Sequence, residues 1–219
     1  MTMETQALAL IKAVEEADSA PKLLNAVVAL AKAKIEAGIP TLIDVLRCNN
    51  PGAAVAAVEG LVLLGEVAVQ PILDSLDGYN YGARAWAIRA LAEIKDSRAL
   101  DLLIAAAETD FALSVRRSAA KGIGTLKWDK LGGEELASAQ QRAFHTLMLT
   151  AADPEWVVRY ATVVGLQAFA VAVADKNPGW VVDILSTLKK IAETDTELSL
   201  RARAKLALIK LESLQIVTV

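Results

Sequence analysis

The octapeptide Arg84-Ala85-Trp86-Ala87-Ile88-Arg89-Ala90-Leu91 predicts the architecture of this chain, because its pattern returns four more times. In every copy the fourth and seventh positions are small and the eighth is Leu or Ile, and Arg opens four of the five copies. Small side chains three residues apart lie on one face of a helix and let a neighbouring helix approach closely. The other copies are Ala54–Leu61, Arg116–Ile123, Arg159–Leu166 and Arg201–Leu208.

The spacing of these copies indicates a repeat protein. They start 30, 32, 43 and 42 residues apart, which is close to the length of one helical hairpin. We therefore predict an all-α fold, an α-solenoid of about six HEAT-like or armadillo-like repeats that form one domain over residues 1–219. Residues 1–38 are expected to form a degenerate N-terminal capping repeat, and residues 127–140 and 174–180 are expected to be loop insertions.

A first helix and a turn should precede each copy. Gly, Pro, Asn and Asp in these turns supply a positive φ, a fixed φ or a side-chain cap. Asp153 is expected to be the N-cap of its helix, with Pro154 in the first turn. One further helical pair is expected between Thr5 and Ile35. The predicted first helices are Ile39–Leu46, Val69–Leu76, Ala99–Ala107, Gln141–Leu149 and Val181–Ile191.

Composition narrows the functional classes. Hydrophobic residues make up 54% of the chain and aromatic residues only 5%, which favours closely packed helices. The net charge of −3 lacks the basic footprint that nucleic-acid binding requires. The apolar stretch at residues 53–73 contains Glu59 and Glu66, so we expect repeat helices and no membrane span. With one cysteine and no secretory signal at the N-terminus, we expect a cytoplasmic protein.

Residues for covalent or metal chemistry are scarce. The single histidine, His145, is interpreted as structural or solvated because no acidic partner is evident on its face. No cluster with metal-ligand spacing occurs in the sequence, so we expect neither a metal nor another cofactor. Cys48 has only Arg47 as a basic neighbour, and a reactive thiolate needs an electropositive pocket. A role for Cys48 as a nucleophile or transient thioether acceptor is therefore the less favoured interpretation.

The arginines that open the copies should line up along one side of the stack. The favoured interpretation is structural, because Arg at this position of HEAT-type repeats commonly pairs with an Asp of the preceding turn. The predicted acidic partners precede the arginines by six or seven residues and are Asp77, Asp110 and Asp153. The arginines are Arg84, Arg116, Arg159 and Arg201.

Aromatic and polar residues gather beside these arginines. Guanidinium groups bind carboxylates through a bidentate fork, and Tyr or Trp rings stack on flat conjugated systems. The group therefore fits a planar, extended dianion, or else a protein interface, where Trp, Tyr and Arg are the favoured anchors. The candidate binding residues are Tyr79, Asn80, Tyr81, Arg84, Trp86, Arg116, Arg117, Trp156, Arg159 and Tyr160.

Three segments with these residues, 76–91, 110–122 and 153–161, resemble the E/F-type phycobilin lyases, and among them the F-type (beta) subunits of phycocyanobilin:α-phycocyanin lyase. The resemblance covers about residues 39–211. It implies a cyanobacterial HEAT-like subunit that joins an E-type partner in a heterodimer. The pair would bind phycocyanobilin, an open-chain tetrapyrrole with two propionates, as its substrate. It would attach this bilin through a thioether to one cysteine of the apo-phycocyanin α subunit.

The resemblance also implies roles for single residues. Arg84, with Arg116 or Arg159, would hold the propionates, while the aromatic residues keep the rings extended. The two catalytic candidates, Asp77 and Asp110, would hold a proton on the pyrrole nitrogens. The related lyase-isomerase carries a His-Cys pair where this chain has Tyr81 and Gly82, so no isomerase activity is expected.

A non-catalytic alternative remains open from the sequence. A HEAT-repeat scaffold or chaperone that binds phycobiliprotein subunits would use the same surface without a bilin reaction. Association with the phycobilisome would fit either activity.

Overall fold

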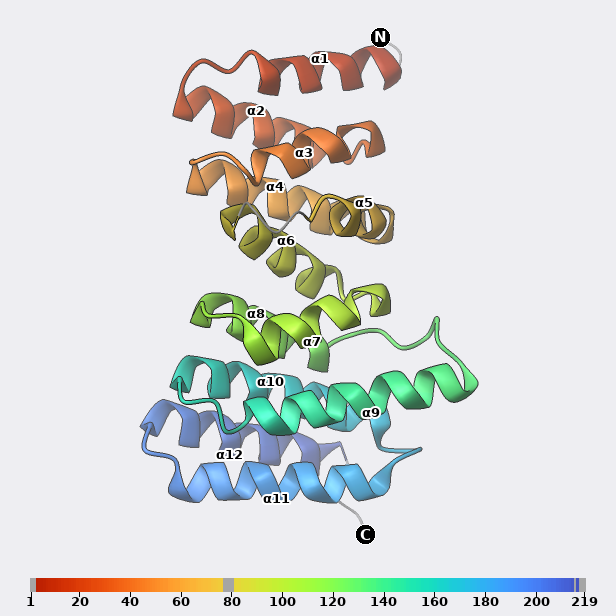
Figure 1. The fold of residues 1–219 in the computed structure, drawn as a ribbon, viewed down its shortest axis with the longest axis vertical. Helices are drawn as coiled ribbons and strands as arrows, with labels where there is room; N and C mark the ends of the chain where they lie inside the picture. Colours follow the sequence, from red (N-terminus) through yellow and green to blue (C-terminus); the bar gives the residue numbers. More distant parts are fainter. Residues whose placement is uncertain (1–2, 77–80, 215, 217–219) are drawn as a thin grey trace. The chain divides into compact units, whose positions relative to one another are not determined.

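The computed structural model describes residues 3–76, 81–214 and 216, and over this part of the chain the fold is all-α. The twelve α-helices form six successive antiparallel pairs (Figure 1). This confirms the predicted fold class and repeat number. The chain divides into two compact units, residues 1–96 and 97–219, which are described one at a time. The single continuous domain stays a prediction.

The N-terminal unit contains three helical pairs. The second helix of each pair packs against the next, α2 on α4 and α4 on α6, so these three helices form one layer of the unit. Short 3₁₀ segments at Glu36–Gly38 and Gly65–Ala68 lead into α3 and α5. The helices are α1 (Met3–Glu15), α2 (Ala20–Ala33), α3 (Ile39–Val45), α4 (Pro51–Leu64), α5 (Val69–Asp74) and α6 (Tyr81–Ile94).

The C-terminal unit repeats this plan with longer helices. The 3₁₀ segment Ser97–Ala99 opens it, and the second helices again pack in succession, α8 on α10 and α10 on α12. The helices are α7 (Leu100–Thr109), α8 (Leu113–Gly124), α9 (Gly133–Thr150), α10 (Trp156–Val173), α11 (Pro178–Thr194) and α12 (Leu198–Ser213).

The small residues of the repeated pattern permit the close packing of the second helices. A Cβ on Gly60 of α4 would lie 2.8 Å from the Cβ of Ala31 in α2. The closest approach joins α8 and α10, where a Cβ on Gly124 would lie only 2.2 Å from the carbonyl oxygen of Gly165. Backbone therefore meets backbone at this crossing, and no side chain fits between the helices.

The insertions are only partly loops. Residues 133–140 form the start of α9, so the first insertion lengthens a helix after a loop, contrary to the prediction. The second insertion is a loop that ends at the start of α11. Trp180 stacks on Phe144 with ring centroids 5.0 Å apart, and Trp128 meets Phe169 edge-on at 6.1 Å. One Trp from each insertion thus fastens it to the helical core.

Two local predictions also need comment. The apolar segment Pro51–Asp74 is long enough to span a membrane by composition, as is α10, but half of each window is buried within the fold. Pro51–Asp74 is also interrupted at Gly65, whose φ of 71° ends α4. Asp153 is not the N-cap of α10, because Glu155 occupies that position. The Asp153 carboxylate instead accepts a hydrogen bond from the Glu155 amide at 2.8 Å in the turn before the helix.

We expect Gly124→Ala to destabilise the protein strongly. The new methyl group would meet the backbone of Gly165, and overpacking of this kind costs about 1–3 kcal/mol or more. Thermal and chemical unfolding would measure the change. Gly132→Ala is the matched control, because a Cβ there meets no atom within 4 Å. Equal unfolding midpoints for the two variants would contradict the importance of this crossing.

Candidate functional site

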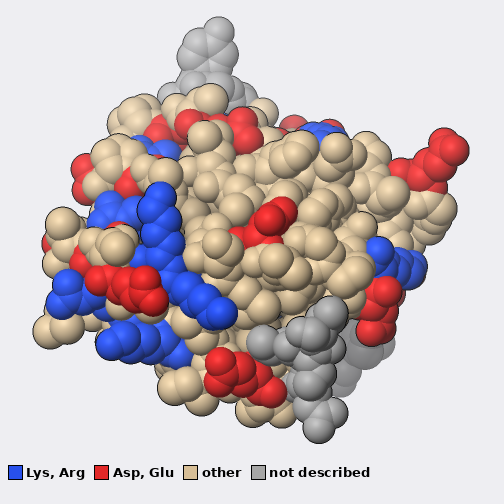
Figure 2. All heavy atoms as spheres, turned by 90° about the horizontal axis from the view of Figure 1, so that it is seen from below, with Lys and Arg blue, Asp and Glu red and all other residues tan. Residues whose placement is uncertain are grey.

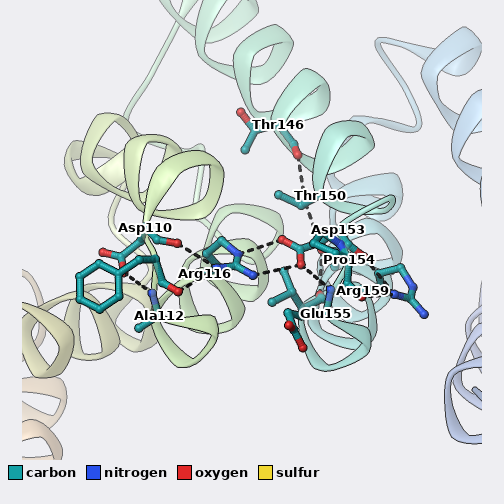
Figure 3. Close-up of polar contacts among 12 residues, drawn as sticks. Asp110, Ala112, Arg116, Thr146, Thr150, Asp153, Pro154, Glu155 and Arg159 are labelled. Atoms are coloured by element: carbon teal, nitrogen blue, oxygen red, sulfur yellow. Dashed lines mark hydrogen bonds and ion pairs between the residues drawn. The ribbon is translucent and has the colours of Figure 1, made fainter.

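A bidentate ion pair joins successive repeats of the C-terminal unit. Nε and Nη2 of Arg116 donate to the two carboxylate oxygens of Asp153 at 2.9 and 3.2 Å (Figure 3). Nη1 of the same side chain donates to the carbonyls of Asp110 and Phe111 at 2.9 and 3.2 Å. The guanidinium of α8 therefore binds the turn of its own repeat and the carboxylate of the following one.

The next repeat has the same contacts. Arg159 donates through Nε and Nη2 to Asp195 at 2.8 and 2.9 Å, and through Nη1 to the carbonyls of Asp153 and Pro154. The predicted carboxylate partners of Arg116 and Arg159 were therefore wrong by one repeat, because each fork binds the Asp of the following turn. The third predicted pair, Arg84 with Asp77, lies partly outside the described residues and stays a prediction. The Asp of the arginine's own turn accepts a hydrogen bond from the arginine through its backbone carbonyl, as Asp110 does from Arg116. Its carboxylate accepts from the backbone amide two residues later, as Asp110 does from Ala112.

These pairs lie away from solvent and shift the pKa values of their members. The side chains of Arg159 and Asp195 are 14% and 10% exposed. The hydrogen bonds from Arg159 lower the pKa of Asp195, and the same bonds raise the pKa of Arg159. The bond to Asp153 likewise raises the pKa of Arg116. Both forks are filled by carboxylates of the chain, so the predicted bilin contacts of Arg116 and Arg159 would compete with them.

Several predicted residues lie on the surface of the C-terminal unit. Trp156 and Tyr160, at the start of α10, are 41% and 37% exposed, and Arg117 is exposed on α8. Burial lowers the pKa of Arg203 in α12, an effect that the nearby Tyr160 opposes. The predicted catalytic residue Asp110 is only 6% exposed. A ligand could therefore reach the aromatic side chains from solvent, whereas the candidate acid is buried.

In the N-terminal unit, one predicted binding residue, Trp86, lines a groove of about 230 Å³ between the α3–α4 turn and the start of α6. Trp86 and Gly82 form one side, while Arg47 and Cys48 form part of the other. Arg89 places its guanidinium carbon 5.8 Å from the centroid of the Trp86 ring. The groove thus combines one aromatic ring, Trp86, with one cationic side chain, Arg47, and both suit recognition of a planar anion.

Arg47 was not among the predicted binding residues. Its Nη2 donates to the carbonyl of Ser75 at 3.2 Å, and together with Arg84 it lines a small depression beside the groove. Arg47 could have been found in the sequence as a residue of the turn in the preceding repeat, because successive turns of a solenoid lie next to one another. The half-buried Tyr81 begins α6. The predicted residues Asp77, Tyr79 and Asn80 lie outside the described residues.

A wider groove of about 850 Å³ lies along α11 in the C-terminal unit. Its lining includes Lys189 and Lys190 but no arginine or aromatic side chain, so it offers no ring on which a conjugated ligand could stack. His145 is exposed on α9, with its ring 5.9 Å from that of Phe144. Within the described residues, no group of three or more His, Cys, Asp or Glu could hold a metal ion. The groove beside Trp86 is the better candidate site.

Comparisons with known proteins agree with this geometry. A family model described as HEAT repeats matches residues 69–167. The phycocyanobilin lyase subunit beta of Pseudanabaena tenuis is 52% identical over 93% of this chain and 72% of its own length. The phycocyanin alpha phycocyanobilin lyase CpcF of Synechocystis is 57% identical over 74% of this chain and 75% of that protein. The solved complex of CpcE and CpcF of phycocyanin lyase from Nostoc matches with a TM-score of 0.71 and 51% identity, over 78% of this chain and 98% of the other.

We expect Asp195→Asn to lower the free energy of unfolding at neutral pH by about 2–4 kcal/mol, because it leaves the Arg159 fork without its anion. The pKa of Asp195 is lowered in the fold, so its contribution is complete above the unfolded pKa of about 4 and is lost as the pH falls through the lowered value. Chemical denaturation of both proteins across this pH range would test it.

The control for this experiment is Asp101→Asn. Asp101 is 80% exposed and pairs with Arg142 at the surface, where an ion pair contributes about 0–1 kcal/mol. We call the Arg116–Asp153 and Arg159–Asp195 pairs the arginine ladder. If Asp195→Asn lowers the free energy of unfolding no more than Asp101→Asn does, or by an amount that does not change with pH, a structural role for the ladder is contradicted.

Proposed function

Because the chain belongs to the family of phycocyanobilin lyase beta subunits, the F-type branch of the E/F-type phycobilin lyases, we propose that it is one subunit of a heterodimeric bilin lyase. With an E-type partner it binds phycocyanobilin and attaches it to a cysteine of the phycocyanin α subunit. The 57% identity to the CpcF protein carries this proposal. We place the reaction in the cyanobacterial cytosol, where phycobilisomes are assembled.

The reaction is the addition of a thiol to an exocyclic double bond. The acceptor sulfur forms a bond to the ethylidene carbon of the bilin, the tetrapyrrole takes up the proton, and no group leaves. Since the ethylidene is already electrophilic, the enzyme mainly has to hold the bilin and the acceptor in a productive pose. Such positioning can supply several kcal/mol of the lowering of the barrier.

The groove of the N-terminal unit supplies the groups for this positioning. We assign Arg47 and Arg84 to the two propionates, because both line the depression beside the groove. Trp86 stacks on a pyrrole ring and keeps the bilin extended. Of the two candidate acids, Asp110 is buried and caps the turn before α8. We therefore assign the proton on the pyrrole nitrogens to Asp77.

The partner completes the site. Pockets that enclose a drug-sized ligand measure roughly 300–1,000 Å³, and the groove of about 230 Å³ is smaller than that range. A tetrapyrrole bound there would remain partly uncovered by the described residues. We assign the rest of its enclosure to the E-type subunit, so covalent transfer requires both subunits.

The first test combines the purified chain, phycocyanobilin and apo-α-phycocyanin, with and without an E-type partner. We expect a covalent adduct with the absorbance of unisomerised phycocyanobilin only when both subunits are present, detected by zinc-stained fluorescence on a denaturing gel. Binding of the acceptor subunit without any covalent product would support the scaffold or chaperone activity instead.

Single substitutions test the groove. Arg47→Ala and Arg84→Ala should each reduce the rate of bilin transfer about 10-fold or more, because each removes a charge-assisted contact to a propionate. Circular dichroism and thermal unfolding would establish that the variants fold. Arg142→Ala is the control, since it removes an arginine that pairs with Asp101 at the surface of α9. Unchanged transfer would exclude the substituted arginine from the site.

A further inference from the structure

Helix α12 is apolar on two of its sides. One stripe of α12 is buried against its own unit, and a second apolar stripe is exposed. Leu198, Leu206 and Ile209 of this second stripe are 70%, 44% and 61% exposed, and they follow the spacing of one helix face together with Ala202. A helix that is apolar on two sides is typical of an interior layer of a solenoid, where a neighbouring helix covers each side.

The first helix of the chain has the opposite character. On α1 the exposed side chains include Glu4, Lys12 and Glu15, and Lys12 pairs at 3.5 Å with Glu16, the residue after the helix. Leu8 is the exposed large hydrophobic residue of α1, at 64%. The N-terminal end is therefore capped by charge, and the C-terminal end is not.

The repeat pattern shows what the exposed stripe would normally contact. The position eight residues after the ladder arginine is Gly124 in α8, which meets the backbone of Gly165 in the following repeat. In α10 the same position is Gln167, whose oxygen accepts a hydrogen bond from Arg203 of α12 at 2.8 Å. In α12 it is Ile209. The stripe thus occupies the surface with which α8 and α10 bind the next repeat.

The arginine ladder is also incomplete at this end. Arg201 donates through Nη1 to the carbonyl of Asp195 at 3.1 Å, as Arg116 and Arg159 do to their own turns. Within the described residues, Nε and Nη2 of Arg201 contact no carboxylate, whereas the same atoms of Arg116 and Arg159 each hold one. An open cationic fork therefore lies beside the exposed apolar stripe.

The charge of this face determines the kind of partner that fits it. Along α12 the charged residues are Arg201, Arg203, Lys205, Lys210 and a single acid, Glu212. Figure 2 views the end that carries α11 and α12 and shows a broad, mostly uncharged area with one acidic side chain inside it, and most of the Lys and Arg side chains, mixed with acidic ones, along one margin. Two copies related by a two-fold axis would bring these cations together, and the charged face of α1 does not complement an apolar stripe. The surface instead fits a different chain with an apolar helix and an acidic turn.

We propose that the C-terminal end of this chain is the docking surface for the E-type subunit. A helical repeat of the partner stacks on the Leu198–Ile209 stripe, and a carboxylate from one of its inter-helix turns enters the Arg201 fork, so that the ladder continues across the subunit boundary. This inference rests on the proposed function for the identity of the partner. It predicts that the heterodimer forms through the same contacts that join the repeats within the chain.

The test measures the dissociation constant of the full-length chain and an E-type subunit by isothermal titration calorimetry. Arg201→Ala should weaken binding at least 10-fold and Ile209→Glu about 100-fold, because they remove the charged contact and place a charge in the apolar one. Leu8→Glu on α1 and Arg142→Ala are the matched controls and should stay within two-fold of wild type. Both test sites are solvent-accessible, and thermal unfolding of each variant alone would verify its fold.

Further measurements separate this inference from the proposed function. Bilin transfer by Arg201→Ala should recover when the concentration of the partner is raised above the weakened dissociation constant. No recovery is expected if Arg201 contacts the bilin. In a set of partner variants, each inter-helix turn aspartate is replaced by Arg, one at a time. One of these variants should bind the Arg201→Glu chain more tightly than it binds the wild-type chain.

Three results would overturn the docking surface. The first is an unchanged heterodimer affinity for both Arg201→Ala and Ile209→Glu. The second is that these variants, without the partner, bind bilin less well than the wild-type chain does. The third is self-association of the wild-type chain through this face. If the wild-type subunits bind each other but transfer no bilin, the proposed activity fails while the docking surface is still measured.

Discussion

The carboxylate shared between two repeats is the contact on which the C-terminal unit depends. Asp153 accepts both donors of the Arg116 fork and the amide of Glu155, while its own carbonyl accepts from Arg159. One residue therefore shapes its turn, starts its helix and fixes the register of its repeat against the preceding one. Because Asp195 repeats this arrangement with Arg159, the distance and angle between neighbouring second helices are set in the same way twice.

This use of charge explains which residues remain for binding. The forks of Arg116 and Arg159 bind carboxylates within the fold, so these two arginines add little cationic character to the surface. The side chains three residues before the arginine that opens each copy of the pattern in this unit point outward instead: Leu113, Trp156 and Leu198 are 44%, 41% and 70% exposed. A dianionic ligand therefore needs arginines outside the ladder pairs of this unit, and Arg47 beside Trp86 in the N-terminal unit meets that requirement.

The sequence predicted the helical pairs well because small residues at fixed spacing report directly on helix packing. Gly60 and Gly165, at the seventh position of the pattern, permit the close contacts that the pattern indicated, while Gly124 lies one residue beyond it. The ladder partners were predicted one repeat too early, since a spacing of six residues suggests a local pair while stacking brings in the next turn. Arg47 was missed for the same reason, as it reaches the groove from another repeat. The helical half of the first insertion carries no repeat signal, and its Trp128 contact with Phe169 depends on tertiary packing.

The unfinished end of α12 follows from the same construction. The forks of Arg116 and Arg159 each hold a carboxylate of the next repeat, and within the described residues the fork of Arg201 in α12 holds none. This chain keeps Arg201 and an apolar Ile209 at that point, although an exposed apolar stripe lowers the solubility of an isolated subunit. In α1 several exposed side chains are charged, whereas α12 exposes an apolar stripe. This interior-type surface is the one on which we propose that a second helical subunit docks. Such a subunit needs no dedicated interface, because any repeat with an acidic turn and an apolar helix already has the complementary geometry.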